Sequence, residues 1–445
     1  MSKKNFIKGT FILTLAGVLT RLLGFVFRIF LSRSIGAEGM GLYQLVMPVN
    51  AICYAIGISG FEVSISRFTA YYSEKKEFNK VKIHAFLCTF MSLLCCLICS
   101  MIMFFSADLL AEYVFHNPGC AILIRILVLS VPLSCIHCMV NSYFLGKEKT
   151  FIPALSQLFE QIIRMAAVFF MVKLYSATGK TCDAALGIKG LVYGEAGAVL
   201  FCSVLFVMRR KKSGQKLTAR KKSGKISSYI KEIKGTALPI CFNRLSLHGL
   251  QSIETVLLPM MLQIYGYSES EALGVYGIIS GMVLPIILFP ATLSNSVSLM
   301  LLPSIARIQD SVTKLRDYAQ KAMLFSIIFG FICIIVFITI GGKIGAFVFD
   351  EPAVEGYIKV ITWLCPFFFI SSTYKSILNA MGKTSRVFAN SMLSEFTNLL
   401  WVAVGVPRLG IKAFLAGMLI SQMLNAFLHV LCFYKTLATQ SVHQS

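Results

Sequence analysis

Twelve apolar segments, each long enough to cross a lipid bilayer, limit the possible folds of this chain more than any other feature. A bilayer offers no water to satisfy the backbone, so segments of this length are predicted to be helices. Of the 445 residues, 56% are hydrophobic and only 14% are charged, which is typical of a membrane protein. We therefore predict an all-α polytopic membrane protein with spans at residues 11–32, 42–70, 84–106, 120–145, 151–175, 186–208, 236–263, 272–304, 321–347, 356–380, 387–406 and 412–434.

The formal net charge of +22 would suggest nucleic acid as the partner of a soluble protein. Here the basic residues lie in every second connection between the predicted spans, so they indicate topology and contact with anionic membrane lipids, and no nucleic-acid partner is expected. The other connections are poorer in Lys and Arg and carry Asp and Glu. By the positive-inside rule, both termini and the basic segment 209–234 are predicted to lie in the cytoplasm.

The segment 209–234 separates two predicted lobes of six spans each, residues 1–208 and 235–445. Short matches recur between the lobes at offsets of 233 to 236 residues: 41–43 as 274–276, 63–64 as 297–298, 146–147 as 382–383, and Glu160 as Glu395. An even number of spans per lobe gives both repeats the same orientation. The pattern therefore predicts parallel repeats, with the transport site between them.

Two arginines lie on one stripe of the first predicted span. At helical spacing, Arg21 and Arg28 share this stripe with Gly17 and Gly24, and the glycines leave room beside the guanidinium groups. Charged residues inside a membrane normally face a bundle interior or a wet cavity, and guanidinium is well shaped to bind phosphate. We therefore predict a cationic cavity for an anionic substrate. In the alternative interpretation, Arg28 reaches the outer surface and Arg21 pairs with a buried Glu.

The seventh predicted span is the most polar after the first. Arg244, His248 and Gln251 form a second helical stripe on it, and we predict that they line the same cavity together with Glu62 of the second span. Two alternatives stay open: Glu62 is the ion-pair partner of an arginine, and His248 is a hydrogen-bonded core residue.

The eighth predicted span contains residues that interrupt helices, namely Pro285, Pro290 and Asn295. A bend is expected there, acting either as a gating element or as a packing kink. Glu160 and Glu395 are interpreted as packing and capping groups of the fold.

Fourteen cysteines are present, most of them inside apolar segments, where they act as small apolar side chains. Cys135, His137 and Cys138 resemble half of a metal site, but no second half is apparent, so neither a metal nor any other cofactor is predicted. No glycine-rich phosphate loop ending in Lys-Ser or Lys-Thr occurs. These features predict a transporter driven by a gradient rather than an enzyme.

Segments 13–49, 242–262 and 274–307, which include LTLAGVLTRLLGFVFRIFLSRSIG and GVYGIISGMVLPIILFPATLSNS, resemble the stage V sporulation protein B family. This family belongs to the multidrug/oligosaccharidyl-lipid/polysaccharide exporter superfamily, which includes the lipid II flippases. The resemblance implies two six-helix lobes with alternating access in the bacterial plasma membrane. It also implies flipping of undecaprenyl-diphosphate saccharides for peptidoglycan, particularly the spore cortex. Arg21 and Arg28 match arginines that contact the diphosphate in lipid II flippases, and Arg244 matches more loosely.

Two other functions stay open. A cation-coupled multidrug exporter also has twelve spans, whereas lipid II flippases have two more, but its cavity should be acidic rather than basic. A non-transporting scaffold that recruits cell-wall synthesis enzymes is the second alternative.

Overall fold

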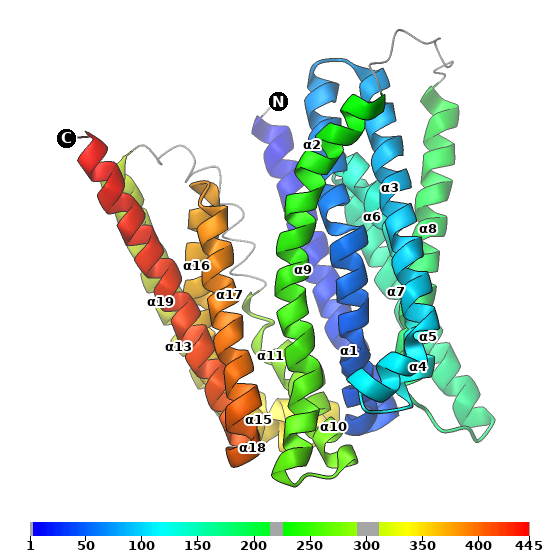
Figure 1. The fold of residues 1–445 in the computed structure, drawn as a ribbon, viewed down its shortest axis with the longest axis vertical. Coiled ribbons are helices and arrows are strands. Elements are labelled where there is room, and N and C mark those ends of the chain that lie inside the picture. The colour runs from blue at the N-terminus through cyan, green and yellow to red at the C-terminus, as the bar shows by residue number, and fades with distance from the viewer. Residues whose placement is uncertain (1–2, 214–225, 292–310, 445) are drawn as a thin grey trace. The chain divides into compact units, whose positions relative to one another are not determined.

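The computed structural model describes residues 3–213, 226–291 and 311–444, and these residues contain helices and no strand. The all-α prediction is confirmed, since each predicted span is helical over most of its described residues. Part of the eighth span, including Asn295, lies outside the described residues. The helices up to the middle of the chain are α1 (Lys3–Gly57), α2 (Ser59–Glu74), α3 (Phe78–Phe105), α4 (Ala107–Leu109), η1 (Leu110–Val114), α5 (Cys120–Leu127), α6 (Ser130–Gly146), α7 (Phe151–Ala177), α8 (Ala184–Ser213) and α9 (Ile226–Tyr265) (Figure 1).

The remaining helices begin after α9. They are α10 (Glu269–Gly277), η2 (Ile278–Val283), α11 (Leu284–Ile287), α13 (Val312–Val336), η3 (Phe337–Gly341), α14 (Gly342–Phe349), α15 (Ala353–Ile361), η4 (Thr362–Leu364), α16 (Cys365–Ala380), α17 (Thr384–Leu400), η5 (Trp401–Gly405), α18 (Val406–Leu409) and α19 (Ile411–Gln444).

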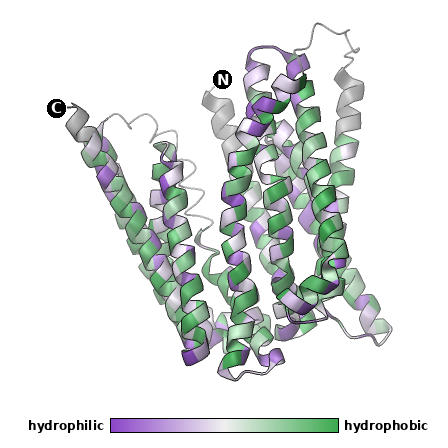
Figure 2. Cartoon of the chain, viewed as in Figure 1, coloured by the Kyte–Doolittle hydropathy of each residue, from purple (hydrophilic) through white to green (hydrophobic). Residues whose placement is uncertain are grey.

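Nine stretches of the described residues are long and apolar enough to cross a membrane. The first stretch, Thr14–Glu74, covers the first two predicted spans. A turn was expected between these spans, but α1 continues through this region and only Gly36 departs from helical geometry there. Its φ of 71° is in the left-handed region, which glycine adopts without strain. The polar helices α9 and α17 are not among the nine. Green, hydrophobic residues run along most helices in Figure 2, while purple gathers near helix ends and in connections.

The chain divides into two compact units. Unit 1 contains residues 1–27 and 45–249, and unit 2 contains residues 28–44 and 250–445. Both α1 and α9 therefore contribute to both units.

In unit 1, α2, α3 and α6 pack together around a core that is rich in cysteine. Cys53, Cys88, Cys96 and Cys135 are fully buried there, and all fourteen cysteines are free thiols. Their role as small apolar side chains, predicted from their positions in apolar segments, agrees with this packing.

In unit 2, α13, α16, α17 and α19 pack into a bundle (Figure 1). The segment 28–44 of α1 belongs to this unit and packs tightly on α10, because two glycines remove side chains from the crossing. A Cβ at Gly41 would lie 2.1 Å from the Leu273 carbonyl oxygen, and one at Gly277 would lie 2.2 Å from that of Ala37. We call this segment the α1 strap, and these contacts hold it against α10 within unit 2.

Polar contacts also hold the α1 strap. Arg33 donates from Nε to the Val348 carbonyl at 2.7 Å and from Nη2 to the Phe347 carbonyl at 2.6 Å. These carbonyls end α14 and have no helical partner, so a cation beside them is favourable. Ser270 donates to Glu38 at 2.6 Å.

Candidate functional site

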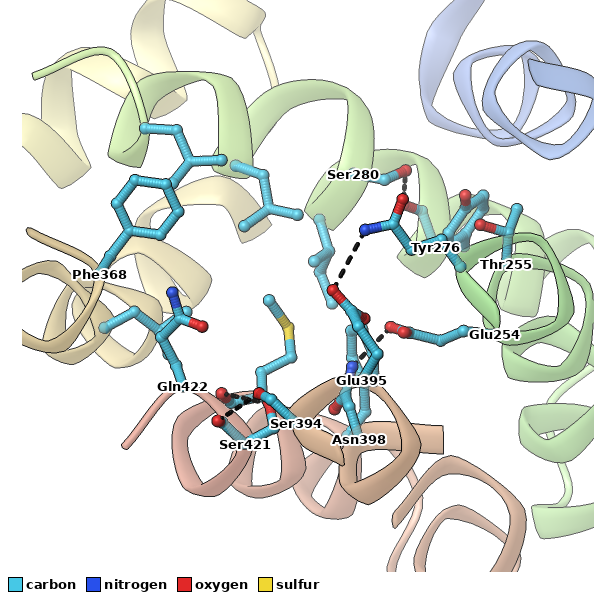
Figure 3. Close-up of a pocket in the computed structure, with 17 residues that line it drawn as sticks. Glu254, Thr255, Tyr276, Ser280, Phe368, Ser394, Glu395, Asn398, Ser421 and Gln422 are labelled. Carbon is cyan, nitrogen blue, oxygen red and sulfur yellow. Dashed lines mark hydrogen bonds between the residues drawn. The ribbon is translucent and has the colours of Figure 1, made fainter. Parts of the chain in front are cut away.

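A pocket of about 380 Å³ lies inside unit 2, among α9, α10, η2, α16, α17 and α19 (Figure 3). Its polar side holds two carboxylates, one from α9 and one from α17. Asn398 donates from Nδ2 to Glu254 at 2.7 Å, and Gln251 donates from Nε2 to Glu395 at 3.1 Å. Each carboxylate is thus oriented by an amide from the other helix, which ties α9 to α17.

The rest of the pocket combines hydroxyl groups with an apolar wall. Ser394 donates to the Ser421 carbonyl at 2.6 Å, and Ser280 donates to the Tyr276 carbonyl at 2.6 Å. Phe368 lies across the pocket from Glu254 in Figure 3. Further apolar side chains come from Leu284, Leu288 and Met418.

The pocket is acidic. Glu254 and Glu395 are close enough to repel each other electrostatically, and the described residues that line the pocket include no Lys or Arg. Lys375 lies near enough to attract Glu395 but is not part of the lining. Carboxylate, amide and hydroxyl oxygens are ligands suited to a small hard cation or to a cationic group of a substrate.

Sequence reasoning identified Gln251 as a site residue but interpreted Glu395 as a packing group and did not select Glu254 or Asn398. The structure brings all four to one pocket. A signal was present, because Gln251 and Glu254 are one turn apart on α9, as Glu395 and Asn398 are on α17. The sequence did not indicate that α9 and α17 pack against each other, so the two pairs of residues could not be assigned to one pocket.

The stripe on α1 is divided between the units. Arg21 is exposed and belongs to unit 1, whereas Arg28 is partly exposed and begins the α1 strap of unit 2. A Cβ added at Gly17 or at Gly24 would meet no atom within 4 Å. The glycines thus leave open space along this helix. The substrate-binding role of the arginines stays a prediction.

Glu62 and Arg244 meet within unit 1. Tyr54 of α1 hydrogen bonds to Glu62 of α2, and Arg244 of α9 lies close enough to attract this carboxylate. Arg244 itself is exposed, and Glu62 and His248 are partly exposed. The role of Arg244 and Glu62 in substrate binding stays a prediction. His248 belongs to unit 1, and the next stripe residue, Gln251, belongs to unit 2.

The helix that contains the proline residues is interrupted. The π-helix η2 leads into α11, which has Pro285 in its first turn, and a turn over residues 288–290 ends at Pro290. Proline lacks the backbone N–H that would continue the hydrogen bonds of the helix, so the interruption is expected at these positions. A gating role for this bend stays a prediction.

Comparison with known families gives two matches. The polysaccharide biosynthesis protein family matches residues 6–309, which is more than half of the chain, and the MatE family matches residues 237–404.

The chain is similar to two proteins of Bacillus subtilis (strain 168). It is 25% identical to stage V sporulation protein B over 435 residues, covering 96% of this chain and 84% of that protein. It is 26% identical to lipid II flippase MurJ over 327 residues, covering 68% of this chain and 58% of that protein.

Among solved structures, the chain is similar to the inward-facing conformation of a multidrug resistance MATE family transporter of the MOP superfamily. The TM-score is 0.69 at 13% identity, and the match covers 98% of this chain and 100% of that chain. This last likeness shows that the fold is MATE-like.

Proposed function

Because this chain belongs to the polysaccharide biosynthesis protein family, we propose that it flips a lipid-linked, diphosphate-bearing saccharide from the inner to the outer membrane leaflet by alternating access. The chain is a membrane transporter with a MATE-like fold and not an enzyme. The family match carries the proposal, and the similarity to stage V sporulation protein B and to a lipid II flippase supports it. The substrate class is an undecaprenyl-diphosphate saccharide used for peptidoglycan, including the spore cortex.

Arg21, Arg28 and Arg244 are the proposed diphosphate ligands. Guanidinium binds phosphate oxygens through two parallel hydrogen bonds. Arg21 and Arg244 are exposed residues, and the open space at Gly17 and Gly24 leaves room beside α1. Glu62 is the carboxylate that attracts Arg244.

Localisation and partners follow from the same proposal. The protein acts in the bacterial plasma membrane with both termini in the cytoplasm. The basic segment 209–234 contacts anionic lipid heads at the inner surface. Cell-wall synthesis enzymes use the saccharide once it reaches the outer leaflet.

The test is reconstitution of the purified chain in liposomes with fluorescent lipid II, followed by measurement of leaflet exchange. Arg21→Ala and Arg28→Ala each remove a charge-assisted bond of about 1.5–3 kcal/mol, so substrate binding should weaken roughly tenfold to a hundredfold. The control is Arg125→Ala, since Arg125 forms an ion pair with Asp108 in which both side chains are substantially exposed, at 38% and 67%.

Exchange at the wild-type rate by both α1 variants, at matched expression, would overturn the role of these arginines. A wild-type protein that causes no exchange but restores cell-wall synthesis in cells would identify a scaffold instead.

One observation favours a cation-coupled multidrug exporter as a second candidate, namely the acidic pocket of Glu254 and Glu395. The same liposomes distinguish the two functions, because an exporter would move a cationic dye and would leave lipid II in its original leaflet.

A further inference from the structure

Unit 1 contains a second polar cluster, separate from the pocket of Figure 3. We call it the α6–α8 cluster. Its members are His137 of α6, Ser156, Glu160 and Arg164 of α7, and Glu195 of α8. His137 is 4% exposed and Ser156 is fully buried, while the two carboxylates and Arg164 are 12–15% exposed. Charged groups buried to this degree inside a membrane protein are costly and usually functional.

Three glycines of α8 bring it close enough to α7 to form the cluster. A Cβ at Gly190 would lie 2.2 Å from Val168, one at Gly194 would lie 3.1 Å from both Arg164 Cβ and the Glu160 carbonyl oxygen, and one at Gly197 would lie 2.3 Å from Ile163. Small residues at this spacing let membrane helices approach closely. Glu195 lies next to Gly194, and its carboxylate lies beside Glu160.

The imidazole of His137 lies at the centre of the contacts. Its Nδ1 is 3.1 Å from Glu195 and 3.8 Å from Glu160, and its Nε2 is 2.7 Å from Ser156 Oγ. Arg164 forms an ion pair with Glu160. Every side chain of the cluster therefore has a polar partner in another helix or one turn away.

The formal charges of the α6–α8 cluster sum to zero only when the cluster binds one additional positive charge. Two ionised carboxylates and one guanidinium leave a net charge of minus one when the imidazole is neutral. An uncompensated charge in a low-dielectric interior is strongly unfavourable. We propose that the α6–α8 cluster is a binding site for a single proton, held by His137 and shared with Glu195 and Glu160.

Other titratable groups surround His137 on the helices that pack against α6. Glu62, Glu160 and Glu195 all lie close enough to Cys138 to interact with it electrostatically, and Arg244 balances Glu62. On α5, Arg125 is paired with Asp108, and on α8, Lys189 donates to Tyr175. Thiols are also present nearby: Cys138 on α6 is close to the carboxylates, Cys202 on α8 contacts Ser156, and Cys135 on α6 contacts Cys96 on α3. None of the groups named here supplies the missing positive charge.

A proton fits the site better than a hard metal ion does. The ligand atoms of His137, Glu160 and Glu195 lie within 4.8 Å of one another, but Arg164 already occupies one side of Glu160 and would repel a metal cation. A hard metal ion also needs more oxygen ligands than the cluster provides. An imidazolium needs only two acceptors, one at each nitrogen, and Glu195 and Ser156 stand at these positions.

The hydrogen bonds of the site fit both protonation states. With a neutral ring, Nδ1–H donates to Glu195 and the Ser156 hydroxyl donates to Nε2. When a proton binds, it forms a new N–H bond at the Nε2 lone pair, which then donates to Ser156 Oγ. The Ser156 hydroxyl can turn toward Cys202 Sγ, which is 3.2 Å away. Uptake and release therefore need only a hydroxyl rotation.

Proton binding by the cluster stands independently of the transported substrate. Its use to drive transport rests on the function proposed above. Chains of Glu and His inside membrane proteins are a common means of coupling to a proton gradient. The cluster joins α6, α7 and α8, so a change in its charge acts on the packing of three helices at once.

The experiment is nuclear magnetic resonance of the full chain, labelled at its six histidines and titrated from about pH 5 to 9 without sodium. His137→Gln identifies the signal of His137. In Glu195→Gln and in Glu160→Gln the cluster is neutral without a proton, so the titration midpoint should fall by about one pH unit or more, a tenfold loss of proton affinity. In Arg164→Gln the midpoint should rise, because the deficit of positive charge grows.

His429→Gln is the matched control, since His429 is fully buried and contacts a hydroxyl, Ser371 at 3.2 Å, with no carboxylate partner among the described contacts. It should leave the His137 signal unchanged. A midpoint that moves in the same direction in Glu195→Gln and Arg164→Gln, or in none of the variants, would overturn the proposal. So would displacement of the proton by about 100 mM sodium, which would identify a metal cation site. Because no substrate is present, failure here leaves the flippase proposal unaffected.

Discussion

At the scale of single residues, this protein uses its charged side chains in two ways inside the membrane. The arginines Arg21 on α1 and Arg244 on α9 are exposed and are the proposed anion ligands, whereas Glu254 and Glu395 are each held by an amide. Hydrogen-bond geometry as well as charge decides what such groups can do.

Replacing Arg21 by Lys tests the geometry of the proposed diphosphate site. Lysine keeps the positive charge but loses the two-pronged donor, so Arg21→Lys should flip labelled lipid II more slowly than wild type and faster than Arg21→Ala. Initial rates of leaflet exchange at matched protein density measure the order. Equal rates for the Lys and Ala variants would mean that the charge alone contributes nothing.

Removing the Asn398 amide should destabilise unit 2. Asn398 is 7% exposed and its bond to Glu254 joins α17 to α9. In Asn398→Leu the carboxyl group loses this partner, so thermal unfolding in detergent should show a loss of about 1–3 kcal/mol. Thr397→Val is the control, since Thr397 is partly exposed and its described hydrogen bond is to the Leu393 carbonyl of its own helix. Equal stability of both variants would contradict this role.

At the scale of elements, backbone contacts hold the α1 strap to α10. The contact at Gly41 and Gly277 is with carbonyl oxygens, which cannot move aside as a flexible side chain can. The proposed lobe motions of a transporter must therefore leave this pair of segments together.

Adding one methyl group to the strap crossing tests this inference. Gly277→Ala puts a Cβ 2.2 Å from the Ala37 carbonyl oxygen, so it should cost about 1–3 kcal/mol or more in stability through overpacking. Gly274→Ala, one turn earlier on α10, is the matched control, because a Cβ there meets nothing within 4 Å. Melting temperatures in detergent compare the two, and an unchanged Gly277→Ala protein would mean that the helices can separate freely.

At the scale of the whole molecule, the orientation in the membrane rests on the alternation of loop charge. The orientation predicted from this alternation has the connection between α7 and α8 outside the cell and the connection between α16 and α17 inside. Native Cys182 lies in the first of these and is partly exposed, so it is an internal reporter of topology.

A membrane-impermeant maleimide applied to intact cells should label Cys182, and Cys182→Ser should abolish the labelling. A cysteine introduced by Thr384→Cys, in a Cys182→Ser background, should react only after the membrane is opened. Labelling of both positions from outside would refute the orientation with cytoplasmic termini.

The helical content and the extent of the spans could be predicted because they depend on local information. In a bilayer each backbone must bond within its own segment, so an apolar stretch of sufficient length becomes a helix whatever its neighbours are. The bend near Pro285 and Pro290 could be predicted for the same reason, since it follows from the backbone properties of proline.

The pairing of distant side chains depended on tertiary structure. Asn398 meets Glu254 across 144 residues, and His137 meets Glu195 across 58 residues, and no periodicity within one helix indicates such partners. The sequence suggested a metal half-site at His137 with the adjacent cysteines, but the structure turns Cys135 toward Ser92, 3.2 Å away, and His137 toward two carboxylates. Glycines let two helices approach closely, so the faces that meet depend on the shape of the two helix surfaces. The hydropathy of either helix alone does not determine them.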